Sequence, residues 1–223
     1  TLGQAGKEEH ILQRTDTPII KTDRGGQVTW HGHGQLVIYW LFDLDSLKWS
    51  VRNLVSHAEQ AIEDVINDCL SSSPSNSDNI SAHARRDAPG VYLYATDDST
   101  STDDNSLDNK IMLGKMASLG FKIKHGFSYH GIAINLNCDL SSFNAINPCG
   151  YAGMQMLRLS DFVAMQTDSE QTEPDAQTEQ QYKLDAAIIL AVSLAQPLIQ
   201  TSKTKANWSI LWQILTKFWT QAT

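Results

Sequence analysis

Apolar residues recur at three- and four-residue spacing between Val51 and Leu70. This spacing is typical of an amphipathic helix with one buried face. The residues on that face are Val51, Leu54, Val55, Ala58, Ile62, Val65, Ile66 and Cys69. Because Cys69 is one of them, we interpret it as a residue of the core.

The same periodicity returns near the end of the chain. Residues Tyr182–Leu198 predict a second helix that ends at Pro197, because proline cannot continue a helix. The tail Trp208–Trp219 is apolar at most positions, and we expect a helix there that packs on the body or on a partner.

Runs of apolar, β-branched and aromatic residues predict strands between the helices. Leu36–Leu44 is apolar at nearly every position, which indicates a buried strand. A short strand over Val91–Tyr94 and a longer one over Ile111–Leu119 form a predicted hairpin. Gly120–Lys124 and Tyr129–Cys138 indicate adjacent antiparallel strands.

The charge of the chain is unevenly distributed. Its 223 residues have a formal net charge of -8, and five acids lie in each of Asp97–Asn109 and Thr167–Gln180. Without these two tracts the charge becomes -8 + 10 = +2, so we expect a nearly neutral body with polar loop insertions near 71–82, 97–109 and 167–180. A nucleic-acid partner is not indicated.

With 41% hydrophobic side chains, the chain is long enough for one domain with a sizeable core. No apolar run is long enough to span a membrane, and the N-terminus has no secretory pattern, so we expect a cytoplasmic protein. Three cysteines without metal-ligand spacing predict reduced thiols, no disulfide framework and no metal; no cofactor is indicated either.

Cys149 is the strongest candidate nucleophile, because Pro148 and Gly150 predict a tight turn that exposes its thiol. Neighbouring backbone N–H groups of such a turn can face an oxyanion. A nucleophilic thiol needs a cation or a base nearby, and the candidates are Lys115, His31 and His130. The alternative interpretations are a free cysteine, a solvated lysine and structural histidines.

Five blocks of sequence together resemble the lipoyl(octanoyl) transferases, which move an octanoyl group from acyl carrier protein to a lysine of a lipoyl domain. The blocks are Asp23–Gln35 (DRGGQVTWHGHGQ), Asp87–Val91 (DAPGV), Lys115–Gly120 (KMASLG), Tyr129–Asn135 (YHGIAIN) and Asn147–Met154 (NPCGYAGM).

The resemblance implies roles for individual residues. Cys149 matches the cysteine that carries the acyl group as a thioester, and Lys115 matches the lysine that favours its thiolate form. The positions that match the acyl-binding segments are Arg24, Gly25, Gly26, Gln27, Val28, Thr29, Trp30, His31, Ser118, Leu119, Gly120, Gly131, Ile132 and Ala133.

The resemblance also implies an α+β fold of the biotin/lipoate protein ligase type, a mostly antiparallel sheet flanked by helices. It implies octanoyl-acyl carrier protein as the donor. The implied acceptors are lipoyl domains of 2-oxoacid dehydrogenase E2 subunits and the glycine cleavage H protein.

Two alternatives remain open at this point. An ATP-dependent lipoate ligase has the same fold but needs no nucleophilic cysteine. A non-catalytic homologue that binds acyl carrier protein or lipoyl domains is suggested by two departures from the family pattern: His33 stands where the family usually has proline, and the chain begins inside the pattern, which we interpret as N-terminal shortening of a single domain spanning 1–223.

Overall fold

The computed structural model describes residues 1–73, 79–96 and 110–163. The acidic tracts Asp97–Asn109 and Thr167–Gln180 lie outside these residues, as do the predicted helix at Tyr182–Leu198 and the tail Trp208–Trp219.

A five-stranded antiparallel sheet in the order β1-β7-β4-β3-β2 forms the centre of the fold. Its strands are β1 (Gln35–Tyr39), β2 (Ile80–Ala84), β3 (Val91–Thr96), β4 (Lys110–Leu119) and β7 (Gly131–Asn135). Strands β5 (Lys122–Lys124) and β6 (Phe127–Tyr129) form a separate hairpin. The predicted α+β class with a mostly antiparallel sheet is confirmed.

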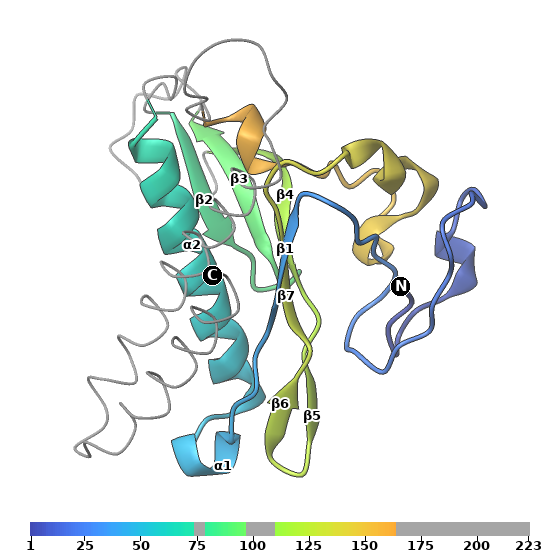
Figure 1. The fold of residues 1–223 in the computed structure, drawn as a ribbon. Helices are drawn as coiled ribbons and strands as arrows, with labels where there is room; N and C mark the ends of the chain where they lie inside the picture. The colour runs from blue at the N-terminus through green and yellow to red at the C-terminus, as the bar shows by residue number, and fades with distance from the viewer. Residues whose placement is uncertain (74–78, 97–109, 164–223) are drawn as a thin grey trace, which may run out of the picture.

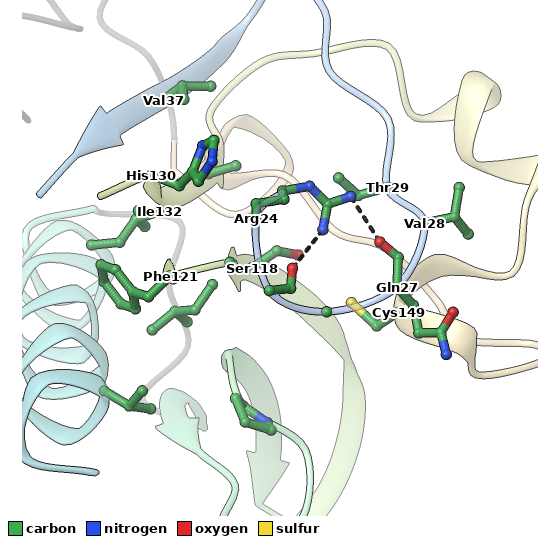
Figure 2. Close-up of a pocket in the computed structure, with 18 of the residues that line it drawn as sticks. Arg24, Gln27, Val28, Thr29, Val37, Ser118, Phe121, His130, Ile132 and Cys149 are labelled. Carbon is green, nitrogen blue, oxygen red and sulfur yellow. Dashed lines mark hydrogen bonds between the residues drawn. The ribbon is translucent and has the colours of Figure 1, made fainter. Parts of the chain in front are cut away.

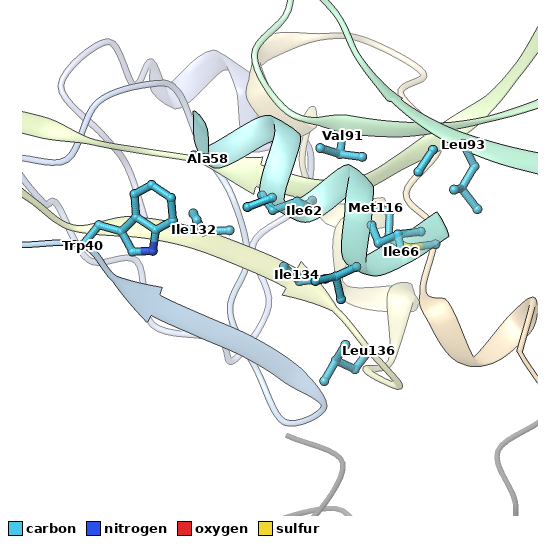
Figure 3. Close-up of a cluster of buried hydrophobic side chains, with 14 of the residues drawn as sticks. Trp40, Ala58, Ile62, Ile66, Val91, Leu93, Met116, Ile132, Ile134 and Leu136 are labelled. Carbon is cyan, nitrogen blue, oxygen red and sulfur yellow. The ribbon is translucent and has the colours of Figure 1, made fainter. Parts of the chain in front are cut away.

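Helix α2 (Val51–Ser71) follows the short helix α1 (Leu44–Leu47) and packs on one face of the sheet (Figure 1). Ser50 begins α2 with a capping box, in which its side chain accepts from the Asn53 N–H and its own N–H donates to the Asn53 side chain. Most of the predicted apolar face of α2 meets the sheet in one core, shown in Figure 3, and Cys69 packs at its edge. Val51 and Val55, in the first turns, lie outside this core, and Val51 is 50% exposed. The predicted helix is therefore confirmed.

The opposite face of the sheet is covered by loops from two distant parts of the chain (Figure 1). These are residues 1–34, which contain the 3-10 helix Glu8–His10, and the segment after β7 with the 3-10 helices Leu140–Ala145 and Pro148–Gly150. The 3-10 helix Leu159–Asp161 instead lies at the end of the sheet, where Leu159 packs against the core. Backbone hydrogen bonds from Leu12 to Ala145 and from Asn147 to His10 hold the two segments together.

The predicted strand at Leu36–Leu44 is wrong in length and burial. Strand β1 ends at Tyr39, and the exposed fraction alternates along it: Leu36 and Ile38 pack against the core, whereas Val37 is 43% and Tyr39 65% exposed. One face of this edge strand therefore stays open, although its side chains are apolar.

Two other boundaries differ from the prediction. Residues 80–82 of the polar tract near 71–82 belong to β2, and 74–78 lie outside the described residues. The predicted strand at Tyr129–Cys138 divides at His130, whose φ of 58° turns the chain from the β5–β6 hairpin into β7. In the part of the chain described, no helix is long and apolar enough to cross a membrane.

Candidate functional site

A cavity of about 330 Å³ is lined by residues of the sheet, of the loops packed on it and of helix α2. Its walls come from the glycine-rich segment 24–31, from β1, β4 and β7, from the first turns of α2 and from the turn that holds Cys149. This volume is in the range of small-ligand sites.

The site residues predicted from sequence converge on this cavity. All of them line it except Trp30, whose ring packs edge-on against Phe143 with a centroid separation of 5.6 Å. The candidate histidines His31 and His130 line the same cavity. Figure 2 shows Arg24, Ser118 and Cys149 close together at one end of it and His130 with Ile132 at the other.

Several apolar lining residues were not predicted. They are Val37 and Tyr39 of β1, Val51 and Val55 of α2, Ala88, Pro89, Phe121 and Tyr151. A signal for the β1 pair exists in the sequence, because an edge strand that is apolar at consecutive positions presents apolar side chains on both faces. No comparable signal marks the others.

Cys149 lies in a left-handed backbone conformation, with φ 59° and ψ 14°, inside the predicted Pro148–Gly150 turn. A non-glycine residue in this conformation is uncommon and costs about 1–2 kcal/mol. Its N–H donates to the Val28 carbonyl at 3.1 Å, which ties the turn to the glycine-rich segment. The thiol is half-buried and lines the cavity.

The backbone N–H groups of this turn do not form the predicted oxyanion site. The N–H of Cys149 is bonded to Val28, that of Gly150 to Asn147, and that of Tyr151 to Pro148. Each donor of the turn is therefore occupied by a carbonyl, and this part of the sequence interpretation is wrong.

Lys115 lies in the middle of strand β4, and it is only 1% exposed although its side chain is charged. The register with β3 passes from Val91↔Ala117 to Tyr92↔Lys115, so Met116 is an extra residue and forms a β-bulge. Met116 and Ala117 both enter the core, and Lys115 is directed to the cavity. The bulge explains how a charge sits inside a buried apolar strand.

The Lys115 ammonium reaches the thiol. Its Nζ donates to Cys149 Sγ at 3.2 Å and to the Pro89 carbonyl at 2.8 Å, and it lies 5.2 Å from the centre of the Tyr92 ring. The predicted contact between Lys115 and Cys149 is present. Cys149 lies in a turn, and the segment around Met156 forms a parallel bridge with Lys115.

The glycines of the site allow close approach of backbone to backbone. A Cβ added at Gly131 would overlap the Ile38 carbonyl oxygen of the neighbouring strand β1. One added at Gly25 would lie 2.6 Å from the Phe121 carbonyl oxygen. These positions bring the cavity walls together.

Arg24 holds the glycine-rich segment in shape. Its guanidinium donates to the carbonyls of Gly25 at 2.9 Å and Gln27 at 2.7 Å; the bond to Gln27 is drawn in Figure 2. Burial lowers the pKa of Arg24, and the Cys149 thiolate acts against that shift. The guanidinium is therefore a second cation near the thiol.

His130 lies beside an acid at the rim of the cavity. Asp23 accepts from the Tyr129 hydroxyl at 2.6 Å and lies 2.8 Å from His130 Nε2. The Tyr129 bond, and then the His130 bond, lower the pKa of Asp23. In the described part of the chain, no group of His, Cys, Asp and Glu side chains is arranged to hold a metal ion.

Comparison with known proteins agrees with the geometry. Residues 1–179 match the family described as the lipoyl protein ligase A/B catalytic domain. An octanoyltransferase of Psychrobacter cryohalolentis is 80% identical over 171 residues, which cover 74% of this chain and 60% of that protein. One of Acinetobacter baylyi is 52% identical over 163 residues, which cover 73% and 62%.

The chain spans about 60% of the length of these curated relatives. The match to the family nevertheless includes every cavity residue named above, from Arg24 to Tyr151. The chain therefore belongs to the lipoyl protein ligase A/B catalytic domain family, as its five sequence blocks indicate.

Proposed function

We propose that this protein is an octanoyltransferase that acts through a thioester on Cys149. The observation that carries the proposal is the 3.2 Å contact between Lys115 Nζ and Cys149 Sγ at the end of an apolar cavity. The relatives named octanoyltransferase support the same activity. An ammonium beside a thiol favours the nucleophilic thiolate.

The first transfer loads the enzyme. The Cys149 thiolate attacks the thioester carbonyl of octanoyl-acyl carrier protein, so that a bond to Cys149 Sγ forms and the bond to the carrier sulfur breaks. The carrier leaves as a thiolate and takes a proton from the Lys115 ammonium. Lys115 is then a neutral amine beside an acylated cysteine.

The second transfer returns the pair to its starting state. The neutral ε-amine of an acceptor lysine attacks the acyl-enzyme, the C–N bond forms and the bond to Cys149 Sγ breaks. Lys115 accepts the proton that the amine nitrogen loses, which restores the ammonium and the thiolate. Lipoyl domains of 2-oxoacid dehydrogenase E2 subunits and the glycine cleavage H protein are the proposed acceptors.

The apolar part of the cavity suits a saturated acyl chain. Leu119, Phe121, Ile132 and Ala133 lie on its walls, with Val37 and Tyr39 at its exposed side. Burial of each methylene contributes about 0.8 kcal/mol to binding. We place the octanoyl chain along this wall with its carbonyl at Cys149.

The proposed donor is an acidic carrier, and basic residues are candidates for its docking face. Within the described residues, Lys122 and Lys124 of the β5–β6 hairpin form no salt bridge, whereas Arg85 Nη2 lies 2.6 Å from Asp87 Oδ2. Arg86 follows Arg85 in the same loop. Charge reversal at Lys122 and Lys124 is expected to weaken carrier binding most at low salt.

The test is intact-mass spectrometry of the chain after mixing with octanoyl-acyl carrier protein. We expect one octanoyl adduct on Cys149, none in Cys149→Ser, and much slower loading in Lys115→Ala. Adduct formation at the parent rate in either variant would refute the assignment. Absence of an adduct in the parent chain would favour a non-catalytic binding protein.

The ATP-dependent ligase alternative is tested in the same assay. An acyl-adenylate mechanism needs no thiol, whereas the structure places a thiol and an ammonium together at the cavity. We expect transfer from octanoyl-acyl carrier protein without ATP. Activity that needs ATP and free octanoate, and that persists in Cys149→Ser, would favour the ligase.

A further inference from the structure

One peptide group lies between the catalytic lysine and a buried acid of helix α2. The Pro89 carbonyl accepts from Lys115 Nζ at 2.8 Å, and the N–H of the same peptide group, that of Gly90, donates to Glu59 Oε1 at 2.9 Å. The order of groups is therefore Glu59 carboxylate, Pro89–Gly90 peptide, Lys115 ammonium and Cys149 thiol.

Glu59, Gly90 and Lys115 of this series are buried, whereas Cys149 is half-buried and Pro89 is exposed. Glu59 is 9% exposed, and it lies on the core-facing side of α2 next to Ala58. Tyr92 holds the same loop from the other side, since its hydroxyl donates to the Ala88 carbonyl at 3.0 Å. A Cβ at Gly90 would lie 2.8 Å from Lys115 Nζ, so only glycine lets the peptide come this close.

A charge at one end of a peptide hydrogen bond acts on the other end. A carboxylate that accepts from a peptide N–H polarises the peptide, and its carbonyl oxygen becomes a stronger acceptor for an ammonium. The acid and the lysine also attract each other directly, and this attraction lowers the pKa of Glu59 against the rise caused by its burial.

We propose that Glu59 is a positioning residue that holds Lys115 in its ammonium form, and in reach of Cys149, through the Pro89–Gly90 peptide. Glu59 touches neither the thiol nor the acyl group. It favours the thiolate–ammonium pair before loading, and it draws a proton back to Lys115 in the second transfer. The inference rests on the proposed roles of Lys115 and Cys149, but its test needs no acyl transfer.

The same helix provides a matched control. Glu63 lies one turn after Glu59 and also accepts from a backbone N–H, that of Ala84. Burial raises the pKa of both acids. The N–H that Glu63 accepts belongs to strand β2, whereas the carbonyl that accepts from Lys115 is that of Pro89, in the loop between β2 and β3.

The experiment compares Glu59→Gln with Glu63→Gln in the full chain. The rate of Cys149 alkylation by iodoacetamide is measured from pH 5 to 10, with peptide mapping to confirm the site. Glutamine keeps an oxygen that can accept from Gly90 but removes the charge. Arg24, the other cation near the thiol, is the same in both variants.

We expect Glu59→Gln to lower the alkylation rate at pH 7 by about fivefold and to move the half-maximal rate to higher pH. Glu63→Gln is expected to stay within about twofold of the parent chain. A Glu59→Gln profile that overlays the parent, or an equal change in both variants, would overturn the proposal. If the variants give the expected alkylation profiles but the parent chain is not loaded with octanoyl, the proposed function is refuted and the role of Glu59 is not.

A second measurement covers the case in which Glu59→Gln does not fold. By linkage, removing the Lys115 charge must act on Glu59 as strongly as Glu59 acts on Lys115. Carbon-13 NMR of the glutamate carboxyls is therefore compared between the parent chain and Lys115→Met. The Glu59 titration is expected to move to higher pH while that of Glu63 stays in place; an unmoved Glu59 titration would overturn the proposal.

Discussion

Gln35 Nε2 donates a buried hydrogen bond of 2.8 Å to Asn135 Oδ1, across strands β1 and β7. The two residues are 100 positions apart in the sequence. The direction of this bond is fixed by backbone groups at both ends. Asn135 Nδ2 donates to the Leu157 carbonyl, so its Oδ1 accepts. Gln35 Nε2 faces that oxygen, which leaves Gln35 Oε1 as an acceptor.

The bond polarity predicts the tautomer of His31. His31 Nδ1 lies 3.2 Å from Gln35 Oε1, so Nδ1 carries the proton and Nε2 of the neutral ring is an acceptor. Nitrogen-15 NMR is expected to show the Nδ1–H form in the parent chain and a mixture of tautomers in Gln35→Met. Exposed His33 provides an internal reference, and an Nε2–H signal for His31 in the parent would contradict the prediction.

The three cysteines are expected to differ strongly in reactivity. Burial raises the pKa of Cys138 to about 11, and burial also raises the pKa of Cys69. Their thiols stay protonated at pH 7.5, where Cys149 is exposed to the cavity beside two cations. Brief iodoacetamide treatment is expected to label Cys149 at least about tenfold faster than either.

Peptide mapping by mass spectrometry checks this order of labelling. In urea the three cysteines are expected to react at similar rates, because the folded environment is lost. Labelling of native Cys138 or Cys69 as fast as Cys149 would show that the thiol of the turn is not activated.

Parts of the fold that depend on local pattern were predictable. The 3.6-residue period gave α2 and its core face, and Pro148 with Gly150 gave the turn at Cys149. The resemblance of five blocks brought together cavity residues that lie far apart in sequence. Of the predicted site residues, only Trp30 does not line the cavity, and its ring packs on Phe143.

Features that depend on backbone partners carried no sequence signal. In the sequence, Glu59 cannot be told from a solvated glutamate on a helix surface. Its hydrogen-bond partner, the Gly90 N–H, lies in a loop that is distant in sequence. The bulge at Met116 that directs Lys115 to the cavity depends on pairing with β3. Likewise, only the structure shows that carbonyls occupy the N–H groups of the Cys149 turn.

Two glycine-to-alanine variants separate crowding from backbone strain. Gly131→Ala places a Cβ against the Ile38 carbonyl oxygen, whereas Gly153 has φ 73° but no atom within 4 Å of the added Cβ. We expect Gly153→Ala to cost about 1 kcal/mol from its left-handed conformation alone. Gly131→Ala is expected to cost about 3 kcal/mol, because strands β1 and β7 must separate.

Urea unfolding at pH 7.5 measures both costs. The activity of the two variants is expected to follow the same order, because Gly131 also lines the cavity. Equal loss of stability in both variants would show that β1 moves aside at little cost.

Glu59→Gln is expected to stabilise the chain at neutral pH, although it slows the alkylation of Cys149. Burial is the first cause of the raised pKa of Glu59 and outweighs the Gly90 bond and the Lys115 charge, so the folded state disfavours the ionised form relative to the unfolded state. A group with a raised folded pKa contributes stability below its unfolded value, about 4.3, and loses that contribution as the pH rises through its folded value. Glutamine is neutral at every pH, so the Glu59→Gln variant does not lose this stability as the pH rises.

The stability difference between Glu59→Gln and the parent chain is therefore expected to be small at pH 4.5 and to grow in favour of the variant towards pH 7.5. Urea unfolding at a series of pH values measures it. A purely structural acid would show the opposite sign, since its removal would destabilise the chain at neutral pH. Stabilisation together with slower alkylation of Cys149 would mean that the chain retains a buried charge, at a cost in stability, for its effect on Lys115.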